Sequence, residues 1–216
     1  MNGSEQVAKV VDVRVPGIRA TELACRRGDR ILFRKMSFDV GPGEALHITG
    51  ANGAGKTTLI RTLAELNTPY AGGAACGGTP GLLDERTGLD PERSLGAALD
   101  FWFSIDRVTE KSVILERLRL YELVDVPVRY LSTGQRKRAA LARLLGQDAL
   151  VWLLDEPLSG LDAASQNLVC TLITEHLAAG RSALVASHQP LDVPNLQTLA
   201  MEDFVVPLEA PEGWEA

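Results

Sequence analysis

The glycine-rich segment at residues 50–57, Gly-Ala-Asn-Gly-Ala-Gly-Lys-Thr, restricts the possible folds of this chain more than any other feature. The apolar run at residues 44–49 is typical of a buried strand, and residues 58–66 have the apolar spacing of a helix. Between a strand and a helix, glycines let successive N–H groups converge on phosphate oxygens, where the helix dipole also favours an anion. The alternative is a glycine-rich turn that binds nothing. Such a turn would need neither the strand before it nor the helix after it. We therefore predict a phosphate-binding P-loop.

The predicted loop supplies backbone donors and two side chains with separate tasks. Lys56 is expected to reach the β- and γ-phosphates of a nucleotide, and the Thr57 hydroxyl to ligate Mg²⁺. The residues predicted to bind nucleotide are those of the loop and the one after it: Gly50, Ala51, Asn52, Gly53, Ala54, Gly55, Lys56, Thr57 and Thr58.

A second acidic motif follows about a hundred residues later, where the apolar run at residues 149–154 ends in Asp155 and Glu156. A carboxylate at such a strand end can hold Mg²⁺ through water, and its neighbour can polarise an attacking water. An acidic pair after a strand is weak evidence by itself. Downstream of a P-loop, it predicts Asp155 as a metal residue and Glu156 as a catalytic one.

The remaining pattern places these motifs in an α/β fold. Strands are expected at residues 18–25, 31–40 and 182–187, and helices at residues 94–105, 109–123 and 162–178. Residues 69–81 are too rich in glycine for a regular element and are predicted to form a loop or a weak hairpin. Strands that alternate with helices around a P-loop predict a layered α/β domain with a largely parallel sheet.

Composition limits what else the chain can be. At 216 residues and 45% hydrophobic content, one well-buried domain is expected, with residues 1–17 as a leader that could add an edge strand at residues 7–15. A net charge of −6 predicts no nucleic-acid partner. There is no apolar run of membrane-spanning length and no basic-then-apolar signal, so the chain is expected to be cytoplasmic. The tail from residue 202 is expected to be loosely held.

The segment of residues 131–135, Leu-Ser-Thr-Gly-Gln, places Ser132 and Gly134 at a helix N-terminus, just before the strand that carries Asp155. An ordinary N-cap is the alternative for this segment alone. In this order, however, it resembles the signature motif of the ATP-binding cassette (ABC) family. Residues 159–162 resemble the D-loop of that family, and His188 stands where its switch histidine does.

The resemblance covers about residues 18–202 and implies a single P-loop (RecA-like) ABC nucleotide-binding domain at residues 18–216. It further implies an N-terminal antiparallel β subdomain and a helical subdomain at about residues 90–142. In this family two copies face each other head to tail, so Ser132 and Gly134 would act in trans on ATP held by the partner's P-loop. Lys56, Glu156 and His188 would be the catalytic residues of an ATPase, with Thr57 and Asp155 on Mg²⁺.

Two positions depart from the family pattern. Arg27 occupies the region where an aromatic ring usually stacks on adenine, and a guanidinium can also stack on a base. Arg86 occupies the place of the Q-loop glutamine, and an arginine cannot ligate Mg²⁺. The resemblance therefore leaves the metal contact and the communication with a partner open at this second position.

Within the family, several segments are similar to the haem exporter ATPases of cytochrome c maturation, including residues 23–28, 48–53 and 187–191. This resemblance implies an integral membrane permease and other maturation proteins as partners, at the cytoplasmic face of the inner membrane. Cys25 and His47 could be considered as haem ligands. The favoured interpretation is that Cys25 is an ordinary loop cysteine and His47 an ordinary strand histidine, and that neither binds haem. The alternatives are another small ABC exporter, a non-transport ATPase of this fold, or a weakly hydrolysing switch subunit.

Overall fold

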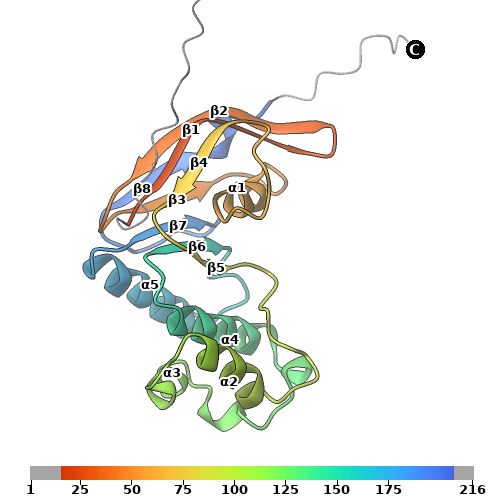
Figure 1. The fold of residues 1–216 in the computed structure, drawn as a ribbon, viewed down its shortest axis with the longest axis vertical. Coiled ribbons are helices and arrows are strands. Elements are labelled where there is room, and N and C mark those ends of the chain that lie inside the picture. Colours follow the sequence, from red (N-terminus) through yellow and green to blue (C-terminus); the bar gives the residue numbers. More distant parts are fainter. Residues whose placement is uncertain (1–15, 207–216) are drawn as a thin grey trace, which may run out of the picture.

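The computed structural model describes residues 16–206, so the predicted leader lies almost entirely outside the described residues, and so does the possible strand at residues 7–15. The described chain forms two β-sheets and five α-helices (Figure 1). The strands are β1 (Ile18–Arg27), β2 (Arg30–Val40), β3 (Ala45–Thr49), β4 (Ala71–Cys76), β5 (Gly81–Leu83), β6 (Val151–Asp155), β7 (Ser182–Ala186) and β8 (Leu196–Ala200). The α-helices are α1 (Lys56–Leu63), α2 (Leu95–Ile105), α3 (Lys111–Arg117), α4 (Thr133–Gly146) and α5 (Ala163–Ala178). Short 3-10 turns occur at Tyr121–Leu123, Val128–Tyr130 and Met201–Asp203.

A parallel sheet with the strand order β5-β6-β7-β3-β8 forms the centre of the molecule. Every residue of β6 and β7 is buried, as expected for strands that are covered on both faces. Because side chains alternate along a strand, Val151 and Leu153 of β6 join one apolar cluster and Trp152 and Leu154 join the other. The apolar runs predicted as buried strands at residues 44–49, 149–154 and 182–187 are confirmed.

The antiparallel sheet, with the order β2-β1-β4, covers one face of this parallel sheet, and α1 packs against strands of both. Phe33 and Met36 of β2 are fully buried beside Leu59 and Ile60 of α1. The other face of the parallel sheet is covered by α4 and α5, and α2 and α3 lie beyond them at the opposite end of the molecule (Figure 1). The P-loop therefore lies between β3 and α1, next to the antiparallel sheet.

The helical end differs in part from the prediction. The helix expected at residues 109–123 is shorter than predicted and consists of α3 alone, which ends at Arg117. It cannot continue because Arg119 has a φ of 52°, in the left-handed region that interrupts an α-helix. Of the aromatic side chains in α2, Phe103 is 1% exposed and belongs to the core, whereas Phe101 is 52% exposed. A core role for this aromatic cluster is therefore right for Phe103 and wrong for Phe101.

Other differences come from tertiary pairing. The glycine-rich segment predicted as a loop or weak hairpin contains β4, which pairs with β1; at Gly72, φ is 74° and a Cβ would lie 2.2 Å from the Glu22 carbonyl. The expectation of a loose tail is wrong for residues 202–206, because Arg34 N–H donates to the Phe204 carbonyl at 3.1 Å and Val205 forms a bridge with Phe33. Residues 207–216 lie outside the described chain. Between residues 16 and 206, no helix is both long enough and apolar enough to cross a membrane.

Candidate functional site

The P-loop encloses its own lysine in this structure. Gly55 has a φ of 110° immediately before α1, and a Cβ there would lie 3.0 Å from the Phe33 ring, so only glycine fits. Lys56 is 7% exposed, and its Nζ donates to the carbonyl of Gly50 at 2.5 Å and to that of Ala51 at 3.3 Å. The ammonium group is therefore held inside the loop, at the place where phosphate charge would be received.

Thr57 and Asp155, the two predicted metal residues, are in direct contact. The Thr57 hydroxyl donates to Asp155 Oδ2 at 2.6 Å, and Asp155 is only 5% exposed. Burial raises the pKa of Asp155; the hydrogen bond from Thr57 lowers it, and the charges of Glu156, Asp84 and Glu85 raise it further. Excess negative charge beside hard oxygen donors suits a divalent cation such as Mg²⁺.

The metal site has few protein ligands of its own. Within residues 16–206 no group of three or more histidine, cysteine, aspartate or glutamate side chains could hold a metal ion. Mg²⁺ is commonly bound through one or two protein oxygens together with substrate phosphates and water. The Thr57 and Asp155 pair therefore fits a cation that arrives with a nucleotide.

Glu156 is joined to two other predicted catalytic residues. Its Oε2 lies 2.9 Å from Nδ1 of His188, and its Oε1 lies 4.0 Å from Nζ of Lys56. Glu156 and His188 follow the neighbouring strands β6 and β7, whose carboxyl ends meet at one edge of the sheet. His47 supports this segment, since its Nε2 lies 3.0 Å from the Ser187 carbonyl oxygen.

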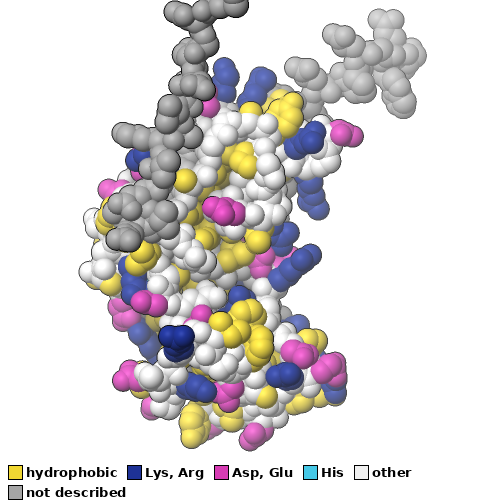
Figure 2. Space-filling view, in the orientation of Figure 1, with side chains coloured by type: hydrophobic (Ala, Val, Ile, Leu, Met, Phe, Trp, Pro, Cys, Tyr) yellow, Lys and Arg dark blue, Asp and Glu magenta, His cyan; other side chains and the backbone are white. Residues whose placement is uncertain are grey.

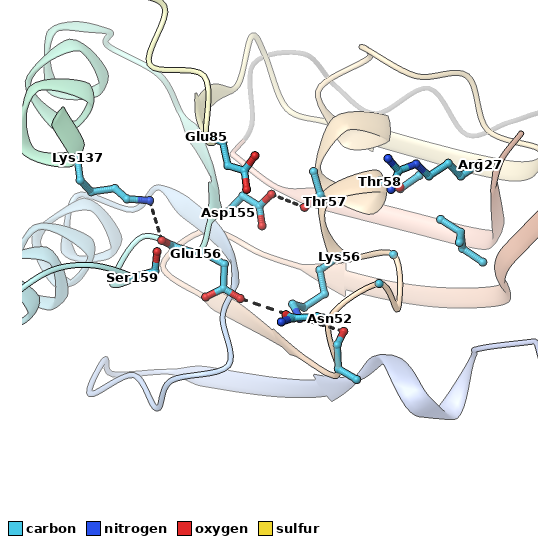
Figure 3. Close-up of a pocket in the computed structure, with 14 residues that line it drawn as sticks. Arg27, Asn52, Lys56, Thr57, Thr58, Glu85, Lys137, Asp155, Glu156 and Ser159 are labelled. Atoms are coloured by element: carbon cyan, nitrogen blue, oxygen red, sulfur yellow. Dashed lines mark hydrogen bonds and ion pairs between the residues drawn. The ribbon is translucent and has the colours of Figure 1, made fainter. Parts of the chain in front are cut away.

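Lys56, Thr57, Asp155 and Glu156 line one cavity of about 280 Å³ at the P-loop (Figure 3), and His188 contacts Glu156 without lining it. Arg27 and Leu32, from β1 and β2, line it together with the loop, which places Arg27 where a nucleotide base could be stacked. Gly50 and Ala54 belong to the loop but do not line the cavity. The lining residues that the sequence predicted are Arg27, Ala51, Asn52, Gly53, Gly55, Lys56, Thr57, Thr58, Asp155 and Glu156.

Four lining residues were missed by the sequence analysis: Leu32, Glu85, Lys137 and Ser159. Each is next to a feature that was recognised. Glu85 precedes Arg86, Lys137 lies two residues after the signature segment, and Ser159 begins the D-loop segment. Arg86 does not line the cavity; its side chain is exposed and its N–H donates to Asp84 Oδ1 at 2.8 Å. Glu85 therefore brings a carboxylate to this wall, beside Asp155 (Figure 3).

Ser132 and Gly134 do not belong to the cavity within one copy of the chain. Ser132 caps α4: its Oγ accepts from Gln135 N–H at 3.2 Å, and its own N–H donates to Gln135 Oε1 at 2.8 Å. Gly134 lies beside Gly160, whose carbonyl oxygen would be 3.3 Å from a Cβ at that position. The signature segment is thus adjacent to the D-loop segment, whose Ser159 lines the P-loop cavity, whereas Ser132 and Gly134 do not line it.

The two residues considered as haem ligands are buried and contact other groups of the protein. Cys25 is 1% exposed, its Sγ lies 3.4 Å from Thr62 Oγ1, and burial raises the pKa of its thiol. His47 is 6% exposed and engaged with the Ser187 carbonyl. Both side chains therefore serve the packing of the sheets.

Comparison with known proteins gives concordant matches. The model of the ABC transporter family matches residues 33–159. The cytochrome c biogenesis ATP-binding export protein CcmA of Novosphingobium aromaticivorans is 51% identical over 188 residues, which cover 87% of this chain and 97% of that protein. The protein of the same name from Zymomonas mobilis is 46% identical over 186 residues, covering 85% and 84%.

Solved structures share the fold at low sequence identity. A putative ABC transporter ATP-binding protein from Pyrococcus furiosus superposes with a TM-score of 0.74 at 22% identity, covering 88% of this chain and all of the other. A bacterial ABC transporter cassette, described as a dimeric structure, superposes with a TM-score of 0.72 at 18% identity, covering 85% of this chain and 94% of the other.

Proposed function

This chain belongs to the ABC transporter family, and from that premise we propose that it is the ATP-hydrolysing subunit of a cytochrome c biogenesis exporter of the CcmA type. The observation that carries the proposed activity is the contact of Glu156 with both Lys56 and His188 at the edge of the P-loop cavity. Three residues from separate parts of the chain meet where the γ-phosphate of ATP would lie.

The contacts assign a task to each side chain. Lys56 neutralises charge on the β- and γ-phosphates once its amine leaves the carbonyls of Gly50 and Ala51. Glu156 orients and polarises the attacking water. His188 holds the Glu156 carboxylate in place, and His188 also contacts the γ-phosphate.

Metal binding is assigned to Thr57 and Asp155. Bound Mg²⁺ would supply additional stabilisation of the negative charge on the phosphates. The Thr57 hydroxyl oxygen and the Asp155 carboxylate would hold the cation, and the buried carboxylate would gain a positive charge that offsets the cost of its burial.

A complete site requires a second copy of the chain. Ser132 is exposed at the N-terminus of α4 and outside the cavity of its own copy, so it is available to nucleotide held by another copy. The dimeric state described for a cassette of this fold supports a head-to-tail pair in which Ser132 and Gly134 act in trans.

The membrane partner is a permease of the same system, CcmB-like, with other cytochrome c maturation proteins, at the cytoplasmic face of the inner membrane. Figure 2 shows hydrophobic side chains over both the sheets and the helical end on this face of the molecule. The exposed apolar residues of α2 and α3 include Phe101, Ile105 and Val113. Apolar exposure of this kind is typical of an interaction surface. Co-purification of the permease with the full-length chain, and stimulation of ATP hydrolysis by membranes that contain it, test this assignment.

Replacing Glu156 with Gln tests the hydrolytic assignment. The Gln side chain keeps the shape but cannot act as a base, so turnover should fall by about a hundredfold to ten-thousandfold while ATP binding persists. Glu116→Gln, an exposed change on α3, is the matched control and should leave both unchanged. Turnover by Glu156→Gln at the rate of this control would contradict the proposed mechanism.

A further inference from the structure

We infer that Lys137 is a positioning residue for Glu156: it holds the main chain that carries this carboxylate, and so makes the hydrolytic site dependent on the position of α4. This inference rests on the proposed function. Lys137 was absent from the residues predicted from sequence, and its side chain extends from α4 to the P-loop cavity that it helps to line (Figure 3).

The contact is made to the backbone. Nζ of Lys137 donates to the carbonyl oxygen of Glu156 at 2.8 Å. Burial lowers the pKa of Lys137, and the charges of Asp155, Glu156, Glu85 and Asp84 oppose this by favouring its ammonium form. Because the hydrogen bond of Lys137 goes to a main-chain carbonyl, its effect is on backbone conformation.

The backbone of Glu156 needs such control. Its φ is 47°, in the left-handed region that is unfavourable for a residue with a Cβ. On one side its N–H donates to the Ala186 carbonyl of β7 at 2.8 Å, and on the other its carbonyl accepts from Lys137 Nζ and from the Ser159 N–H, the latter at 3.2 Å. Together these bonds define where the side chain begins, and Lys137 supplies the one that comes from α4; they therefore decide whether Oε2 can meet Nδ1 of His188 at 2.9 Å. Strained backbone of this kind persists only when its surroundings over-determine it.

The position of Lys137 on α4 gives the contact a second consequence. Ser132 caps the same helix, and a separation of five residues is about 7.5 Å along a helix axis. In the proposed dimer the N-terminus of α4 touches nucleotide bound by the other copy, whereas Lys137 holds Glu156 of its own copy. A movement of α4 at one nucleotide site thus changes the placement of Glu156 at the other.

The test compares three single variants of the full-length chain. Lys137→Met keeps the length and apolar stem but removes the donor, Lys137→Arg restores a charged donor, and Arg136→Met is the control on the exposed face of the same helix. We expect Lys137→Met to lower kcat about tenfold to a hundredfold, with the KM for ATP and the equilibrium binding of ATP changed less than about twofold. Lys137→Arg should recover most of the loss, and Arg136→Met should match the unchanged chain.

A double-mutant cycle with Glu156→Gln separates positioning from general support of the fold. If Lys137 acts through the Glu156 carboxylate, adding Lys137→Met to Glu156→Gln should lower the residual turnover no further. A further loss in the double variant would overturn the inference, and so would a kcat of Lys137→Met equal to that of Arg136→Met. Should Lys137→Met fail to fold, Lys137→Leu, which also lacks a donor, carries the same cycle. Failure of the proposed function is distinct, because the unchanged chain would then hydrolyse no ATP or Glu156→Gln would retain full turnover.

Discussion

Replacing Asp155 with Asn should stabilise the ligand-free protein while it abolishes productive binding of Mg²⁺ and ATP. Asp155 is 5% exposed, and burial is the largest cause of its raised pKa, so its charged form destabilises the folded state at neutral pH. Asn removes the charge and can still accept the hydrogen bond from Thr57. Stabilising single substitutions commonly add about 0.5–2 kcal/mol, and we expect a gain of about 1–2 kcal/mol in the free energy of unfolding at pH 8. For a chain of this size that corresponds to about 2–8 °C in Tm.

The dependence on pH follows from the direction of the shift. A carboxylate whose pKa is raised in the folded state favours folding when it is protonated, and this contribution is lost as the pH rises through the folded-state pKa. The difference between Asp155→Asn and the unchanged chain should therefore be largest at pH 8. It should shrink as the pH falls through the folded-state pKa of Asp155, where the native residue also becomes neutral.

Thermal unfolding with and without Mg²⁺ and ATP is the assay. Ligand at a hundredfold excess over its Kd should add about 2.7 kcal/mol to the unchanged chain and almost nothing to Asp155→Asn, so the order of stability reverses. Asp84→Asn is the matched control, because Asp84 is 7% exposed but paired with Arg61 at 3.1 Å. It should lower stability by about 1–2 kcal/mol. An Asp155→Asn variant that unfolds below the unchanged chain at pH 8, as Asp84→Asn should, would refute this reasoning.

Two further variants address the loop and its neighbour. Lys56→Ala removes the buried ammonium group that would meet the phosphates. The affinity for ATP, measured by calorimetry, should therefore fall at least about tenfold. The control variant Lys35→Ala, on the exposed side of β2, should bind ATP as the unchanged chain does. Intact binding by Lys56→Ala would refute the assignment of this loop. Arg86→Gln should alter the Mg²⁺ dependence of turnover or its stimulation by the permease, because it replaces a cation with an amide in the residue that follows Glu85, which lines the cavity. If neither quantity changes, this position has no part in metal binding or communication.

Much of the fold could be predicted because its strongest signals are local. The strand, loop and helix around residues 50–57 and the buried run that ends in Asp155 are determined by apolar spacing and glycine placement over a dozen residues. The later motifs were recognised from the family resemblance, and the match of residues 33–159 to the ABC transporter family confirms the family. The strands β4, β5 and β8 were not predicted, because they depend on pairing with β1, β6 and β3, and their own sequences are short, glycine-rich or partly exposed.

The sequence by itself predicted the kind of chemistry, since the P-loop, the acidic pair and the signature segment point to one family when they are taken in their order along the chain. Only the tertiary structure decided which of those residues meet. Glu156 and His188 are 32 positions apart and touch because β6 and β7 are neighbours, which no local pattern encodes. The same is true of Glu85 and Lys137, which reach the cavity because β5 pairs with β6 and α4 packs against β5. Side chains of this second kind depend on how distant segments pack, and for that reason they were found only in the folded structure.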